Sequence, residues 1–259
     1  MDVSSHDGQR MRLKVIACEV LFREICLCSA HSRNVISLEF LQRGLHDNPD
    51  VLRSEVQKKI DETDEKTYSG ILLGYALCSN GIAGVGARGI PLIVPRAHDC
   101  ITLFLGSKER YIEYFKQNPG TYYYTSGWLE RAGSNIERKV HDGLGLGKKY
   151  EEYVKKYGED NARYLIQFEN SWIENYSQVA FIDFEFVKFL KLDAHAKEIA
   201  RQRNWEYSEI PGDIRLIKKL IDGEWDEDEF ITVEPGHEIV ASYDDRVLDS
   251  RPSKDQNLS

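Results

Sequence analysis

Short apolar runs in the first hundred residues constrain the fold of this chain most. They cover Leu13–Ala17, Ser69–Leu77 and Pro91–Val94, and the second run is apolar on both faces. Strands with both faces apolar are typical of the centre of a parallel sheet, where helices cover the sheet on both sides. Because helix-like segments alternate with these runs, we predict an α/β fold of the Rossmann-like kind, with a mostly parallel sheet and flanking helices.

The segments between the apolar runs supply the helices and further strands. Residues 19–30 and 107–117 predict helices, and Val35–Leu41 predicts a second strand. Asn48 followed by Pro49 predicts the start of an amphipathic helix over Pro49–Asp61, since Asn is favoured at the N-cap and Pro at the first helical position.

The rest of the chain divides into fewer clear elements. We expect one α/β domain over residues 12–241, with a helical insertion at about 130–176. Further strands are expected over 179–184 and 230–233, and helices over 192–203 and after Asp213. The polar ends, residues 1–11 and 242–259, are expected to be disordered.

The bulk composition excludes several classes of function. The net charge of −9 and the lack of a basic run argue against nucleic-acid binding. No apolar stretch approaches 18 residues, so we expect no membrane span. The polar first twelve residues lack the apolar core of a signal peptide, and we expect a cytoplasmic protein with reduced cysteines.

Three of the five cysteines follow the apolar runs. Cys18 and Cys78 come directly after the first two runs, and Cys100 lies six residues after the third. Ligands of open α/β sheets bind beyond the carboxyl ends of the strands. If the strands are parallel neighbours, three thiols meet there and can hold zinc or a [4Fe–4S] cluster with one open position. Burial as small apolar residues is the alternative.

Polar residues near these cysteines complete the candidate site. His98 and Glu19 are the candidate acid/base residues, and His98 is also an alternative metal ligand. The expected contacts to a small polar or anionic substrate come from Arg96, Ser79, Asn80, Gly81 and His46. Cys26 and Cys28 point in different directions on a helix, which favours a structural role for both.

Several of these segments resemble an uncharacterised bacterial and archaeal family described as a domain of unknown function. The matching segments are Ile16–Glu24, Gly44–Asp47, Gly74–Gly81, Pro95–Ile101, Leu105–Lys108 and Pro119–Tyr122. The genomic settings of members of that family are similar to those of corrinoid-dependent methyltransferase systems of anaerobes. The resemblance therefore implies a role in one-carbon or corrinoid methyl metabolism, with a corrinoid protein or a methyltransferase as partner.

The arrangement of cysteines at strand ends is also similar to that of quinolinate synthase and the diphthamide radical enzymes. Those enzymes bind one [4Fe–4S] cluster through cysteines from three α/β units. This chain departs from their plan, because its segment Ala180–Phe184 carries no cysteine. The leading hypothesis is a metal or cluster site at Cys18, Cys78 and Cys100. One alternative is a metal-free module that binds a small ligand or a corrinoid protein, with the cysteines in a structural role. The other alternative is a thiol nucleophile, such as Cys78 near His98.

Overall fold

The protein divides into two compact units. The computed structural model describes residues 10–131, 146–170 and 175–253. Unit 1 combines the chain up to Tyr111 with the segment from Asp213 onward, and unit 2 is Ile112–Gly212. The single domain expected over 12–241 is therefore replaced by two units, because the central segment has a sheet of its own.

Unit 1 is built on a five-stranded sheet with the strand order β2-β1-β3-β4-β8. Its first four strands run parallel and β8 is antiparallel to β4. The central β3 and β4 are buried along their whole length, as strands covered on both faces should be. The strands are β1 (Arg12–Cys18), β2 (Val35–Leu41), β3 (Gly70–Gly74), β4 (Leu92–Pro95) and β8 (Phe230–Val233).

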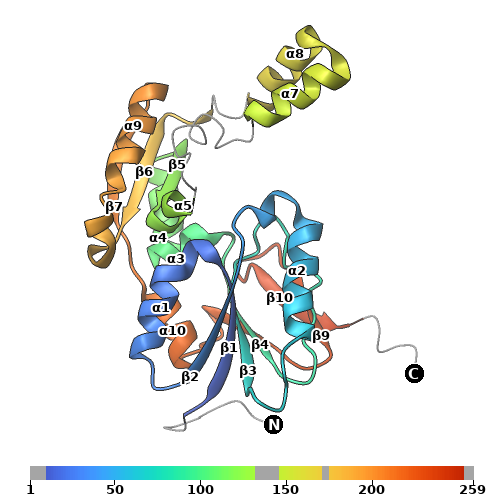
Figure 1. The fold of residues 1–259 in the computed structure, drawn as a ribbon. Coiled ribbons are helices and arrows are strands. Elements are labelled where there is room, and N and C mark those ends of the chain that lie inside the picture. Colours follow the sequence, from blue (N-terminus) through green and yellow to red (C-terminus); the bar gives the residue numbers. More distant parts are fainter. Residues whose placement is uncertain (1–9, 132–145, 171–174, 254–259) are drawn as a thin grey trace. The chain divides into compact units, whose positions relative to one another are not determined.

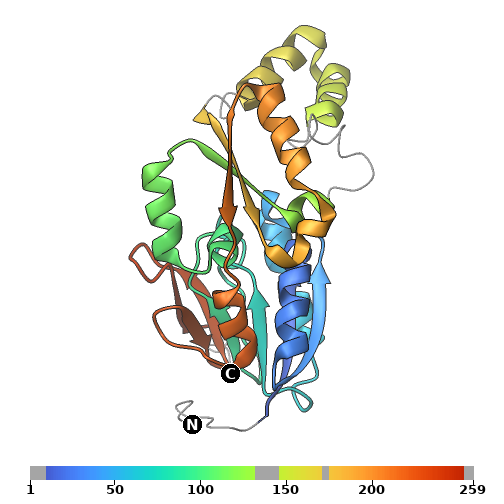
Figure 2. The ribbon, with the colours of Figure 1, turned by 90° about the vertical axis from the view of Figure 1, so that its left-hand side faces the viewer.

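Helices cover both faces of this sheet (Figure 1). Helix α1 packs beside α10 on one face, and α2 lies on the other (Figure 2). The Asn48 side chain caps α2 by accepting a hydrogen bond from the Val51 amide, as the sequence predicts. The helical elements of unit 1 are η1 (Glu19–Leu21), α1 (Phe22–His31), η2 (Leu45–Asp47), α2 (Pro49–Asp61), α3 (Cys100–Leu105) and α10 (Arg215–Asp222); α4 (Lys108–Gln117) runs into unit 2.

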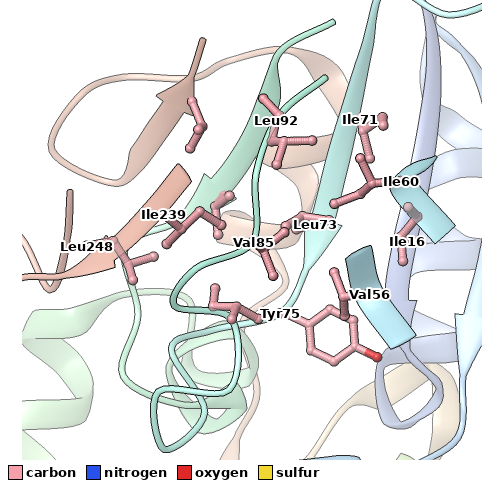
Figure 3. Packing of buried hydrophobic residues seen from close by; sticks show 14 of the residues in the cluster. Ile16, Val56, Ile60, Ile71, Leu73, Tyr75, Val85, Leu92, Ile239 and Leu248 are labelled. Atoms are coloured by element: carbon pink, nitrogen blue, oxygen red, sulfur yellow. The ribbon is translucent and has the colours of Figure 1, made fainter. Parts of the chain in front are cut away.

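An apolar core between the sheet and α2 extends to the C-terminal strands of the chain (Figure 3). Ile239 of β9 (His237–Ala241) and Leu248 of β10 (Leu248–Pro252) are fully buried in it. The tail expected to be disordered from residue 242 therefore contains an ordered strand, because Val247 and Leu248 have apolar surface to bury. Of the first eleven residues, which are expected to be disordered, all but the last two lie outside the described residues, and β1 begins at Arg12, where the expected domain begins.

Unit 2 contains a parallel three-stranded sheet with the order β5-β6-β7. Helix α9 packs on this sheet through Ala196, Ile199 and Ala200. The expected helical insertion corresponds to α7 and α8, which are only one part of the unit. Its elements are β5 (Thr121–Thr125), α5 (Ser126–Glu130), α7 (Leu146–Tyr157), α8 (Glu159–Asn170), β6 (Gln178–Asp183), η4 (Glu185–Leu190), α9 (Asp193–Arg203) and β7 (Glu206–Pro211).

The mostly parallel α/β architecture predicted from the sequence is confirmed. None of the helices in the described part of the chain has the length and apolarity needed to cross a bilayer.

Candidate functional site

The carboxyl edge of the unit 1 sheet carries the residues that the sequence singles out. Strands β1, β3 and β4 are parallel neighbours in that order, which confirms the condition set for convergence of the cysteines. The chain leaves β1 toward β2 on one side and later returns to β3 on the other. The two crossovers diverge between β1 and β3, and ligands bind at such a switch point in open α/β sheets.

Cys18 is the last residue of β1 and therefore lies at this switch point. Its neighbour Ala17 is in register with Gly74, the last residue of β3. The strands approach so closely there that a Cβ on Gly74 would lie 2.4 Å from the Cβ of Ala17. Glycine at position 74 therefore allows the end of β3 to lie this close to the end of β1.

Cys78 begins a left-handed turn after β3. Cys78, Ser79 and Asn80 have φ angles of 48°, 56° and 66°, and the Gly81 amide closes the turn on the Cys78 carbonyl at 2.9 Å. Left-handed backbone costs about 1–2 kcal/mol for each residue with a Cβ. Such strain persists only where the surroundings fix it, and it concentrates at functional sites.

Two hydrogen bonds connect this turn to the loop that carries Cys100. The amides of Leu77 and Cys78 donate to the carbonyls of Ala97 and His98, both at 2.9 Å. Two residues further on, Cys100 begins α3. Three cysteines from three separate segments therefore lie at one edge of the sheet.

Asp99 holds the start of α3 in place. Its carboxylate accepts hydrogen bonds from the Ile101 amide and the Tyr111 hydroxyl, both at 3.0 Å. Burial raises the pKa of this carboxyl in spite of these two bonds. Asp99 therefore brings a partly buried carboxyl group next to Cys100.

The thiols of Cys18, Cys78 and Cys100 influence one another. Burial raises the pKa of Cys18 to about 11 and that of Cys78 to about 12. The pKa of Cys100 is raised by burial first and then by Asp99, Cys78 and Cys18. Cys18 also contributes to the raised pKa of Cys78, and all three thiols keep their protons at neutral pH.

Tyr75 adds a polar group that the sequence analysis missed. Its side chain is only 4% exposed, and its hydroxyl has no hydrogen-bond partner among the residues that the structure describes. Burial raises the pKa of this phenol first, followed by Cys18 and Cys78. In Figure 3 the phenol oxygen lies at the margin of the apolar cluster. A buried hydroxyl without a partner is costly, and a ligand at this edge would satisfy it.

Glu19 and His46 lie next to the sheet edge, on the side of β2. One carboxylate oxygen of Glu19 accepts the Arg43 amide at 3.0 Å, and the charge of Glu19 contributes to the raised pKa of both Cys18 and Tyr75. His46 is half-buried in η2, with its Nε2 3.4 Å from the Asp47 carboxylate. The acid/base role expected for Glu19 and the substrate contact expected for His46 stay predictions.

Arg96 is buried beneath the site and forms contacts of another kind. Its guanidinium donates to the backbone carbonyls of Glu227, Phe230, Arg246 and Leu248. These bonds hold the C-terminal segment against β4 and give Arg96 a structural role. The substrate contact expected for Arg96 stays a prediction.

The remaining predicted residues differ in exposure. His98, Ser79 and Asn80 are exposed, and Gly81 is buried where a Cβ would lie 2.5 Å from Leu52. Cys28 is buried in α1, and after burial the largest cause of its raised pKa is Asp222 of α10. This position agrees with the structural role expected for Cys28.

The thiols do not have the geometry of metal ligands in this structure. Across residues 10–131, 146–170 and 175–253, no three His, Cys, Asp or Glu side chains are arranged to hold a metal ion. Binding of one ion by Cys18, Cys78 and Cys100 would therefore require the three side chains to move from their positions in this structure.

Comparison with known proteins identifies one family. The family described as "Protein of unknown function (DUF1638)" matches residues 40–221, a range that includes Cys78 and Cys100 and begins after Cys18. Neither the curated proteins nor the solved structures gave a match.

Proposed function

Because the chain belongs to DUF1638, a family of proteins of unknown function, its role has to be inferred from its own site, and we propose that Cys18, Cys78 and Cys100 bind a thiophilic metal centre. The supporting observation is their convergence on the carboxyl ends of adjacent parallel strands. Cys18 and Cys78 also pack against the apolar core, and their place at a switch point, where ligands bind, favours a ligand role over packing alone.

The alternative of a reactive thiol has less support. Nucleophilic cysteines have a lowered pKa, because the thiolate is the reactive form. Here burial raises the pKa of all three thiols. A metal centre would displace the thiol protons on binding, so raised values are compatible with metal binding and unfavourable for a metal-free nucleophile.

Zinc and an iron–sulfur cluster both fit three thiolates with one open position. In the zinc form, the metal would lower the pKa of a bound thiol or water. In the cluster form, it would act as a Lewis acid or an electron carrier. The family resemblance implies a role in corrinoid-dependent methyl metabolism, and this role stays a prediction.

Metal analysis of anaerobically purified protein tests the proposal. We expect either stoichiometric zinc in colourless protein or iron and sulfide with absorption at about 400 nm. Replacement of Cys78 by Ser should remove the metal, whereas Cys26→Ser, the matched loss of one thiol from α1, should retain it. Protein that binds neither zinc nor a cluster after anaerobic reconstitution would refute the proposal.

A metal-free binding site is the second candidate, and the unpartnered Tyr75 hydroxyl favours it. In that case a small polar ligand would accept or donate a hydrogen bond at Tyr75, and the thiols would line its pocket. Tyr75→Phe separates the two proposals. It should leave the metal content unchanged if the thiols alone bind the ion.

A further inference from the structure

Unit 2 has a cavity at the carboxyl edge of its own parallel sheet. The cavity has a volume of about 190 Å³ and lies where β5, β6 and β7 end. Ser126 directly follows β5, Asp183 ends β6, and Glu209 lies near the end of β7. Since Thr125 is in register with Ile182, Ser126 and Asp183 are neighbours across the two strand ends.

Ser126 provides a buried polar group without a partner. The residue is 1% exposed and lines the cavity, and its hydroxyl has no hydrogen-bond partner within the described part of the chain. Buried hydroxyl groups in folded proteins are nearly always hydrogen-bonded. The missing partner of Ser126 therefore points to a ligand group at this position.

Carboxylates dominate the charge of the cavity. Asp183, Asp193 and Glu209 line it together with one cation, Lys188. The ammonium group of Lys188 lies 2.7 Å from the exposed Glu185 and 3.9 Å from Asp183. Three acids against one lysine leave a surplus of negative charge.

The neighbouring groups neutralise only part of this surplus. Lys197 pairs with Asp193 at 2.7 Å, and the Tyr207 hydroxyl donates to Glu209 at 3.4 Å. The pKa of Asp183 is raised by burial and then by Glu209. A cation next to Asp183 would relieve both the burial of its charge and the repulsion by Glu209.

Three apolar side chains also line the cavity. Phe181 and Val187 are 2% and 3% exposed, and Leu192 is partly buried beside them. An alkyl group can pack on these side chains while a charged group faces the carboxylates. This mixture of carboxylates and apolar side chains suits an amphipathic organic cation better than a hydrated metal ion, which would leave the apolar side chains unused.

We propose that this cavity is a second ligand site, which binds a small primary ammonium compound with an apolar body. The ammonium group donates to the Asp183 carboxylate and to the Ser126 hydroxyl, and the alkyl chain packs on Phe181 and Val187. The site lies within unit 2 and needs none of the cysteines.

NMR titration of the full-length, isotope-labelled protein with n-butylammonium tests this proposal. We expect chemical-shift changes confined to the cavity residues, and much weaker changes with 1-butanol and butyrate, which match the probe in size but lack the positive charge. Equal binding of 1-butanol, stronger binding of butyrate, or no localised shifts at saturating probe would overturn the proposal.

Two variants and one control identify the groups involved. Asp183→Asn should weaken n-butylammonium binding by about tenfold or more, and Ser126→Ala by a few-fold. Glu198→Gln removes one negative charge from α9 without touching the cavity, and its binding should equal that of the wild type. An equal loss in Glu198→Gln and Asp183→Asn would overturn the proposal, since general surface charge would then explain the binding. Retained dispersion of the spectra shows that each variant is folded.

Discussion

The two parallel sheets of this protein place polar groups at the same position but use different chemistry. In unit 1 the carboxyl ends of the strands bring together thiols, which burial keeps protonated. In unit 2 they bring together the carboxyl groups of Asp183 and Glu209, next to Asp193 at the start of α9. Parallel strands thus determine where a site forms, and the residue at each strand end determines what the site can bind.

Loss of a thiol from unit 1 should have the largest effect. Outer-shell changes at metal sites lower affinity by roughly 10- to 100-fold, so we expect Cys78→Ser to lower zinc affinity by more than about 100-fold. Competition with a chromophoric chelator under anaerobic conditions measures this change.

The contrast between the two sheets also predicts which substitutions leave zinc affinity unchanged. Cys28→Ser, which removes a buried thiol of α1, should retain wild-type zinc affinity, as should Asp183→Asn in unit 2. If Cys28→Ser lowered the affinity as much as Cys78→Ser, the strand-end thiols would not be the metal ligands.

Much of the unit 1 fold follows from the sequence, because its signals are local. The helix Pro49–Asp61 and the strands Val35–Leu41 and Phe230–Val233 have the predicted bounds. Strand β7 was missed, since Glu206–Pro211 is mostly polar and its register with β6 is set by tertiary packing. Strand β10 was missed because only Val247 and Leu248 interrupt a polar tail.

The two sites differ in how far they could be predicted. Cysteine is rare in this chain, so three of five at strand ends were recognisable. The chain has 43 acidic residues, and Asp183, Asp193 and Glu209 do not stand out among them. Tyr75 lies inside an apolar run and looks like a core residue. Its unpartnered hydroxyl, like that of Ser126, becomes visible only when the surrounding chain is folded.

The basic residues near the two sites should respond differently to substitution. Arg96→Met leaves four carbonyls without their shared donor, so we expect it to lower the free energy of unfolding by about 3 kcal/mol or more. Lys188→Met removes a half-exposed cation on the surface of unit 2 and should change the free energy of unfolding by less than about 0.5 kcal/mol. Urea denaturation of both variants measures the difference. Equal effects would show that the carbonyl contacts of Arg96 contribute little.

The strained turn after β3 distinguishes stability from function in unit 1. Ser79→Gly relieves one left-handed residue and should stabilise the protein by about 1 kcal/mol. Because the same turn orients Cys78, a more flexible turn should also bind zinc more weakly. Lys191→Gly, at the φ of 53° that ends η4 in unit 2, should give similar stabilisation with unchanged zinc affinity. If Lys191→Gly weakened zinc binding as well, the loss of zinc affinity in Ser79→Gly could not be attributed to the turn that carries Cys78.

The smallest expected effect concerns the cost of charge in the unit 2 cavity. The pKa of Asp183 is raised in the folded protein, first by burial, so the folded state holds this proton more tightly than the unfolded chain. Folding stability therefore falls as the pH rises from the unfolded pKa to the folded one, and the loss persists above it. Asp183→Asn removes this cost and should raise the melting temperature slightly at pH 7, by the equivalent of less than about 1 kcal/mol, with no gain below the unfolded pKa.

Arg201 holds the pKa of Glu198 at about 2, so Glu198→Gln should show the opposite sign or no change. Thermal unfolding between acidic and neutral pH measures both. If Asp183→Asn were less stable than the wild type at pH 7, the carboxylate would stabilise the fold. If the variant is instead more stable and binds n-butylammonium more weakly, Asp183 is retained for its ligand at a cost in stability.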